Sequence, residues 1–146
     1  YYYYMSNLLF PNIIKNKRIL LRLDLNVPIY KRKILDSTKI IKSLDTIKYI
    51  RKNKPKRLNI ISHLGNPNGR YNSNLVLEPI ANKLSSLLNE EINYSKIHNN
   101  LSNNSIFFFE NLRFHQGEYD NDSNFARRLS NYGDIYINDA HNVHYT

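Results

Sequence analysis

Short apolar runs divide the chain at regular intervals and predict a series of buried strands. Residues 19–28 start with large apolar side chains and end at Pro28, so this run is too short for a helix and is typical of a strand buried on both faces of a parallel sheet. Comparable runs occur at residues 58–61, 92–97, 106–109 and 135–137. The sequence therefore predicts five strands.

Between these runs, apolar residues recur at the spacing of one helical face. The predicted helices run from Lys39 to a stop at Pro55, from Leu75 to Leu88 and from Asp122 to Asn131. The apolar face of the first comprises Ile40, Ile41, Leu44, Ile47 and Ile50. Residues 36–38, Asp-Ser-Thr, offer N-caps for it, and Gly133 is a stop signal for the last helix. This alternation predicts a three-layer, Rossmann-like α/β domain with a mostly parallel sheet.

Length and composition narrow the class of protein further. A chain of 146 residues without cysteine fits one domain that has neither a disulfide framework nor a thiolate metal site. No apolar run approaches the roughly 20 residues of a membrane span, so we expect a cytoplasmic protein. Residues 1–17 are interpreted as an N-terminal lead-in that packs on the sheet edge. Met5 is a candidate initiator, which would make Tyr1 to Tyr4 an upstream artefact.

The net charge of +9 is unevenly distributed, because most Lys and Arg residues lie in the first half of the chain. Such an excess is compatible with a basic module that binds nucleic acid or another polyanion. Asn, Lys, Ile and Tyr are also the residues favoured by codons rich in A and T, so base composition can supply much of the lysine. The tyrosines are scattered or bunched at the terminus, which argues against a nucleic-acid stacking surface.

Polar residues follow four of the predicted strands. The pairs are Asp24 and Asn26, Ser62 and His63, Asn111 and Arg113, and Asn138 and Asp139. Parallel strands end at one edge of a sheet, so these pairs should converge on a ligand site. Arg113, with Lys39 in the first turn of a helix, suits a small, multiply anionic ligand. Alternatively, Asp24 and Asn26 only shape the turn before Pro28, and Arg113 only neutralises Glu110 or Asp139.

Two common kinds of site are not supported by the sequence. The loop at residues 62–69 contains Gly65 and Gly69, but their spacing and the following Arg70 do not match a Walker A phosphate loop. His141 and His144 are three residues apart without carboxylate or thiolate partners, so we expect no metal site.

Four motifs follow one another along the chain: RLDLNVP at residues 22–28, SHLG at residues 62–65, ENLRFH at residues 110–115 and NDA at residues 138–140. Together they resemble the amino-terminal domain of the phosphoglycerate kinase family. The resemblance extends from about Lys17 to the end of the chain. It implies that residues 18–146 are part of a substrate-binding domain, truncated before the nucleotide-binding domain.

By this resemblance, Asp24 and Asn26 would hold the hydroxyl and carboxylate region of 3-phosphoglycerate. His63 and Arg113 would bind its phosphate. Lys39 stands where the family has an arginine that stabilises the transferring phosphoryl group, so the resemblance makes it the catalytic residue. Positioning and cations carry most of the catalysis of phosphoryl transfer.

Several positions depart from the family pattern. Leu64 and Gly65 match it, but Asn66 and Asn142 stand in place of two arginines. Lys39 keeps the charge but loses the planar fork that grips two oxygens at once. We therefore expect weak or absent affinity for 3-phosphoglycerate.

The resemblance also implies what the chain would need to act as an enzyme. The full-length family member, expected to be a monomer, transfers a phosphoryl group reversibly between 1,3-bisphosphoglycerate and ADP, giving 3-phosphoglycerate and ATP in glycolysis. Mg and ATP or ADP would bind to the missing C-terminal nucleotide domain, so we expect this chain to bind no cofactor by itself. The alternatives are a basic nucleic-acid-binding module and a non-catalytic remnant.

Overall fold

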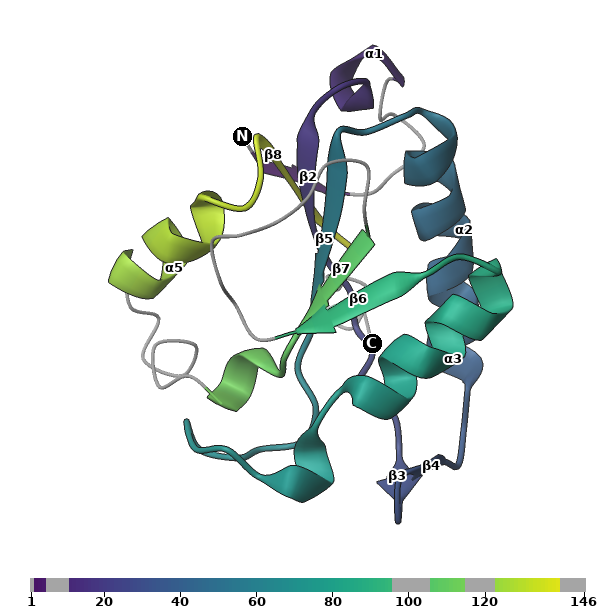
Figure 1. Ribbon diagram of the computed structural model, residues 1–146. Coiled ribbons are helices and arrows are strands. Elements are labelled where there is room, and N and C mark those ends of the chain that lie inside the picture. The colour runs from purple at the N-terminus through teal and green to yellow at the C-terminus, as the bar shows by residue number, and fades with distance from the viewer. Residues whose placement is uncertain (1, 5–10, 96–105, 115–122, 140–146) are drawn as a thin grey trace.

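The computed structural model describes residues 2–4, 11–95, 106–114 and 123–139, which form a parallel sheet between two layers of helices (Figure 1). The six strands are ordered β1-β8-β2-β5-β7-β6, and every pair of neighbours is parallel. They are β1 (Tyr2–Tyr4), β2 (Arg18–Arg22), β5 (Arg57–Ile61), β6 (Ile92–Ser95), β7 (Ile106–Phe109) and β8 (Ile135–Asn138). The predicted α/β class with a parallel sheet is confirmed.

The helices cover both faces of this sheet. They are α1 (Pro11–Ile14), α2 (Thr38–Lys52), α3 (Glu78–Leu88) and α5 (Ser123–Ser130), with 3-10 turns η1 (Ser73–Leu75) and η2 (Leu112–Phe114). Helices α2 and α3 lie together on one face, and α5 lies on the other (Figure 1). A two-stranded antiparallel hairpin, β3 (Ile29–Tyr30) and β4 (Lys33–Ile34), extends from the lower end of the molecule (Figure 1).

The order of the strands places a topological switch point beside β2. The chain leaves β2 through α2 to reach β5 on one side, whereas β8 pairs with β2 on the other side. The loops that follow β2, β5 and β7 gather at the lower end of the molecule (Figure 1). Open α/β sheets bind ligands outside the carboxyl ends of their strands, next to such a switch point.

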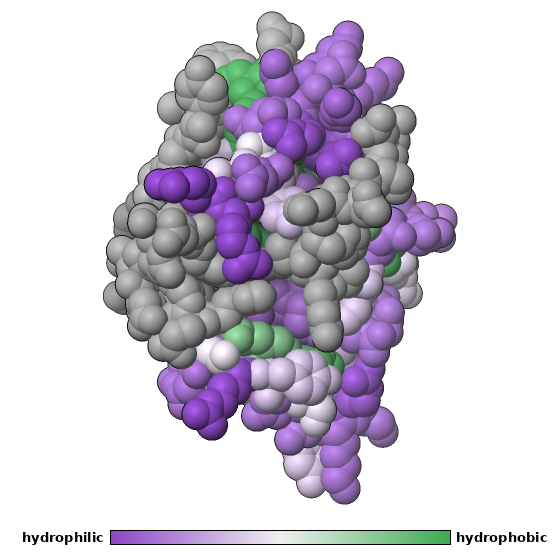
Figure 2. Space-filling model, turned by 60° about the vertical axis from the view of Figure 1, so that its left-hand side comes forward, coloured by the Kyte–Doolittle hydropathy of each residue, from purple (hydrophilic) through white to green (hydrophobic). Residues whose placement is uncertain are grey.

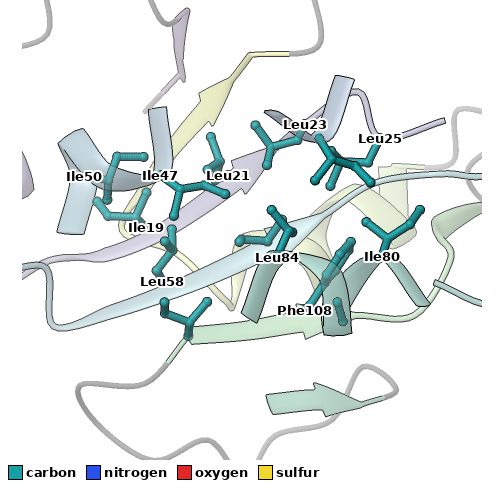
Figure 3. Packing of buried hydrophobic residues seen from close by; sticks show 14 of the residues in the cluster. Ile19, Leu21, Leu23, Leu25, Ile47, Ile50, Leu58, Ile80, Leu84 and Phe108 are labelled. Carbon is teal, nitrogen blue, oxygen red and sulfur yellow. The ribbon is translucent and has the colours of Figure 1, made fainter. Parts of the chain in front are cut away.

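The larger of two hydrophobic clusters fills the space between the sheet and helices α2 and α3 (Figure 3). Strand β2 contributes Ile19 and Leu21 to this cluster, and α2 contributes Ile47 and Ile50. The predicted apolar face of α2 is wrong at Ile41, which is 56% exposed. Ser43 and Thr46 are buried on α2 instead, because the buried stripe continues between Ile40 and Ile50 through these small polar side chains.

The smaller cluster lies on the face that α5 covers. Leu20 and Phe109 face this side, and each alternates along its strand with residues of the larger cluster. The rings of Phe109 and Tyr132 meet edge to face, with centroids 5.0 Å apart. Both faces of the central strands are therefore apolar, as the uninterrupted hydrophobic runs predict.

The starts of two helices differ from the prediction. Helix α3 begins at Glu78 and not at Leu75, since residues 73–75 form η1 and Val76 is extended before a first turn that contains Pro79. The side chain of Ser37 makes no cap hydrogen bond at the start of α2.

Asp36 shapes the start of α2 in place of Ser37. Its Oδ1 accepts hydrogen bonds from the Thr38 backbone N–H at 2.9 Å and the Thr38 hydroxyl at 2.6 Å, and these bonds lower the pKa of the Asp36 carboxyl.

At one edge of the sheet, Tyr2–Tyr4 pair with β8, where the sequence predicted no strand.

Hydrophilic residues make up most of the coloured surface on the face turned forward in Figure 2. The face turned forward in Figure 2 shows small hydrophobic areas near its upper and lower ends, with hydrophilic residues around them. Within residues 2–4, 11–95, 106–114 and 123–139, no helix is long and apolar enough to cross a membrane.

Gly133 is needed for close packing more than for ending α5. Helix α5 ends at Ser130, and a Cβ added at Gly133 would lie 2.7 Å from the Leu20 Cβ and 2.9 Å from the Leu20 backbone nitrogen. The Asn59 side chain, fully buried in β5, donates to the carbonyl of the preceding Tyr132 at 2.6 Å. The turn from α5 into β8 therefore packs directly against β2.

Gly133→Ala should destabilise the fold, because the new methyl group meets backbone that cannot move away. Overpacking of this kind costs about 1–3 kcal/mol. A urea unfolding curve should show a lower midpoint for Gly133→Ala and an unchanged midpoint for the control Asn131→Ala, an exposed position in the same turn. Equal midpoints for the two variants would contradict this account.

Candidate functional site

Ser62 joins the ends of the three central strands at the carboxyl edge of the sheet. Its buried hydroxyl accepts a hydrogen bond from the Leu25 N–H at 3.1 Å, and its carbonyl accepts from the Leu112 N–H at 3.0 Å. The Leu23 N–H donates to the Ile61 carbonyl at 3.0 Å just before this point. The loops after β2, β5 and β7 are thus bonded directly to one another.

The peptide groups of Gly65 bring two predicted site residues to one place. The Gly65 N–H donates to the Asn26 Oδ1 at 3.0 Å, and Arg113 Nη1 donates to the Gly65 carbonyl at 3.4 Å. Gly65 has φ +61°, and a Cβ there would come within 2.8 Å of the Leu75 side chain. Glycine is therefore required where side chains from the β2 and β7 loops meet the β5 loop.

Lys39 lies against Asp24 at the same edge. The Lys39 Nζ is 3.0 Å from Asp24 Oδ2 and 3.2 Å from Asp24 Oδ1, with side chains 44% and 17% exposed. Asp24 Oδ1 also accepts a hydrogen bond from the Asn26 N–H at 3.2 Å. Asp24 therefore shapes the local turn, as one interpretation of the sequence expects, and also holds the amine of Lys39.

Asn111 supports this arrangement through hydrogen bonds from every polar atom of its side chain. It is fully buried, and its Oδ1 accepts from the N–H groups of Leu64 at 3.2 Å and Arg113 at 3.0 Å. Its Nδ2 donates to the carbonyls of Leu64 at 2.8 Å and Leu75 at 2.9 Å. The side-chain amide thereby fixes the loop at residues 63–65 relative to Arg113.

Glu110 fixes a third segment next to Asn111. Its buried Oε1 accepts from the N–H groups of Leu77 at 3.1 Å and Asn111 at 2.8 Å, and its Oε2 accepts from the Tyr94 hydroxyl. Burial, together with the hydrogen bond to Glu110, raises the pKa of the Tyr94 phenol. The carboxylate therefore connects the start of α3 and strand β6 to the end of β7.

Thr46 is a residue at this edge that the sequence analysis missed. Its hydroxyl donates to Asp139 Oδ2 at 2.8 Å, and the Asp139 N–H donates to the Arg22 carbonyl at 2.9 Å. The sequence feature that could have indicated it is a threonine next to Ile47, on the buried side of an amphipathic helix. This bond connects α2 to the end of β8, at the switch point of the sheet.

The predicted residues His63 and Asn66 lie in the loop that follows β5. His63 is half-buried and Asn66 is exposed, and both lie in the same loop as Leu64 and Gly65. Asn142 and the histidines near it lie outside the described residues. The part of the chain that the structure describes contains no group of three or more His, Asp or Glu residues that could hold a metal ion.

Replacing Asn111 by leucine should loosen the loop at residues 63–65, because four backbone groups would lose their partner. Leaving a buried polar group without a partner costs about 1–3 kcal/mol. Asn111→Leu should lower the urea midpoint and speed hydrogen exchange of the Leu64 N–H, whereas Asn74→Leu, an exposed position in η1, should change neither. Unchanged exchange at Leu64 would refute the role given to Asn111.

Comparisons with known proteins show which protein family this chain resembles. A sequence model of the family described as phosphoglycerate kinase matches residues 11–146. The phosphoglycerate kinase of Borreliella afzelii is 40% identical over 138 residues, covering 88% of this chain and 35% of the relative. The phosphoglycerate kinase of Orientia tsutsugamushi (strain Ikeda) is 42% identical over 137 residues, covering 88% and 34%.

Solved structures agree with the sequence comparisons. The structure of phosphoglycerate kinase from Coxiella burnetii matches with a TM-score of 0.78 at 34% identity and covers 94% of this chain and 34% of that one. The enzyme from Pyrococcus horikoshii gives a TM-score of 0.73 at 28% identity, covering 87% and 35%. This chain spans about a third of the length of the relatives it matches. Its sequence match and its fold together show that the chain belongs to the phosphoglycerate kinase family.

Proposed function

We propose that this chain is the substrate-binding part of a phosphotransferase of the phosphoglycerate kinase type, with 3-phosphoglycerate or 1,3-bisphosphoglycerate as its ligand. The observation that supports this most is the meeting of three loops around Gly65. Asn26 and Arg113 bond to its two peptide groups, while Lys39 and Asp24 pair at the same edge of the sheet.

The chemistry of these side chains suits a small acid that carries a phosphate and a hydroxyl. Arg113 and Lys39 supply positive charge for the two anionic groups. The oxygen of the Asn26 amide is engaged by Gly65, so its NH₂ group is what Asn26 can offer to a ligand oxygen. Asp24 can accept a hydrogen bond from a hydroxyl, and His63 in the neighbouring loop is assigned to the phosphate by its place in the SHLG motif.

The whole reaction belongs to the same proposal. It is the reversible transfer of a phosphoryl group between 1,3-bisphosphoglycerate and ADP, in a cytoplasmic glycolytic monomer. ATP or ADP, with magnesium to neutralise phosphate charge, would be bound by a further nucleotide domain of the full-length enzyme. In this chain, Lys39 would place its ammonium group against the transferring phosphoryl group, where developing charge is stabilised.

Three substitutions weaken the basic character of the proposed site. Lys39 replaces a family arginine and is already paired with Asp24, and Asn66 and Asn142 replace two others. A hydrogen bond to a charged group contributes about 1.5–3 kcal/mol. Loss of two such contacts could remove most of the affinity, and this observation favours the alternative of a non-catalytic remnant.

The chain should bind 3-phosphoglycerate weakly, and Asn66→Arg should strengthen binding because it restores a charge-assisted contact. We expect titration calorimetry at moderate salt to detect no micromolar binding to the unmodified chain. The dissociation constant should fall by about tenfold or more in Asn66→Arg. Asn131→Arg adds the same charge at the opposite end of the sheet and should have little effect.

Two results would count against these assignments. Micromolar affinity of the unmodified chain would show that Lys39 and Asn66 are adequate replacements for arginine. Equal strengthening by Asn66→Arg and Asn131→Arg would show general attraction of an anion to a basic protein, without a specific site.

The chain alone should not turn over ATP with 3-phosphoglycerate. Phosphoryl transfer requires that donor and acceptor are held in line with water excluded, and the nucleotide-binding role is assigned to a further domain. A coupled spectrophotometric assay on the purified chain should give the rate of the enzyme-free blank. A rate that rises in proportion to the amount of chain would overturn this expectation.

A further inference from the structure

The β3–β4 hairpin has an unusual turn that holds two cations at its tip. Lys31 and Arg32 have φ angles of +49° and +64°, so both lie in the left-handed region. Two-residue hairpin turns of this kind favour Asn-Gly, because larger side chains are disfavoured there by about 1–2 kcal/mol each. Backbone strain of this kind tends to occur at functional positions, so the two basic side chains are candidates for a binding role.

Two adjoining hollows lie beside this hairpin. The first, of about 280 Å³, is lined on the hairpin by Tyr30, Lys31 and Arg32 and on the other side by Ser73 and Asn74. The second, of about 590 Å³, lies between the hairpin and helix α3, with Lys33 on one side and Lys83 on the other. Arg32 and Pro79 line both hollows, so the two form one continuous surface that we name the basic groove.

The charge of the basic groove is strongly positive. Four cations line it, namely Lys31, Arg32, Lys33 and Lys83, and no carboxylate is among its described lining residues. Glu78 forms an ion pair with Arg32 at the edge of the groove, with side chains 47% and 57% exposed. Glu78 therefore offsets one of the four cations that line the groove.

An exposed aromatic ring lies among these cations. Tyr30 on strand β3 is 63% exposed, and the Lys31 Nζ lies 5.4 Å from the centre of its ring. Cations that follow a chain of phosphates, beside an aromatic face on which a base can stack, are the usual components of a single-strand binding surface. The sequence argued against such a surface because the tyrosines are scattered, but the fold sets Tyr30 on a strand beside the basic side chains.

We propose that the basic groove binds single-stranded nucleic acid. Lys33 and Lys83, on opposite sides of the larger hollow, contact successive phosphates. Tyr30 stacks on a base at the smaller hollow, and Arg32 lies between the two. This role is independent of the binding of a small phosphorylated acid around Gly65, because none of the groove residues belongs to that site.

The test measures binding of a fluorescein-labelled oligouridylate to the full 146-residue chain by fluorescence anisotropy, between about 50 and 200 mM salt. Lys33→Gln/Lys83→Gln should raise the dissociation constant by about tenfold and reduce the slope of log affinity against log salt by about two. The matched control Lys42→Gln/Lys48→Gln removes the same charge from exposed positions of α2 outside the groove and should change binding by less than about twofold.

A second pair of variants tests stacking separately from charge. Tyr30→Ala should weaken binding by about fivefold or more. The control Tyr71→Ala removes a tyrosine that is 64% exposed but does not line the groove, and should leave binding unchanged. Urea unfolding of each variant establishes that its fold is retained.

Several outcomes would overturn the proposal. One is absence of binding by the unmodified chain at low salt, and another is equal weakening by the two double variants. Unchanged binding in Tyr30→Ala would remove the reason for choosing nucleic acid over other polyanions. A polyglutamate peptide that competes as well as the unlabelled oligouridylate would show that the groove attracts polyanions without preference for nucleic acid.

Discussion

The buried side-chain amide of Asn111 is the interaction on which the candidate site depends. It uses both of its donors and both of its acceptor positions, and thereby joins the loop after β5, the turn before α3 and the start of η2. A parallel sheet brings these loops to one edge but does not determine their conformation. Because the amide is fully buried, its bonds do not compete with water, and Arg113 and Gly65 are held in one relative position.

The parts of the fold that followed from the sequence are those governed by burial. Runs such as residues 106–109 bury large apolar side chains on both faces, which is typical of central strands in a parallel sheet. The central strands and their parallel direction could therefore be predicted. The start of α3 could not, because it depends on a tertiary hydrogen bond from the Leu77 N–H to the Glu110 carboxylate. The exposure of Ile41 was missed because a helical pattern cannot distinguish which neighbouring stripe meets the sheet.

The candidate site, like the fold, could be predicted only in part. The convergence of Asn26 and Arg113 followed from the parallel sheet, since both residues lie in loops that follow central strands. Their actual meeting point did not, because each bonds to the backbone of Gly65, and the partner of a side chain carries no pattern in the sequence. Thr46 was missed for the same reason, as its bond to Asp139 crosses from a helix to a strand end far along the chain.

Both proposed anion sites contain a cation that is already paired with a carboxylate, Lys39 with Asp24 and Arg32 with Glu78. An exposed ion pair such as that of Arg32 with Glu78 contributes about 0–1 kcal/mol, so a ligand can open it at little cost. The carboxylate that remains would still repel the incoming anion, at a distance where salt screens only part of the charge. In the basic groove, an anion should therefore gain most from the two lysines of the larger hollow.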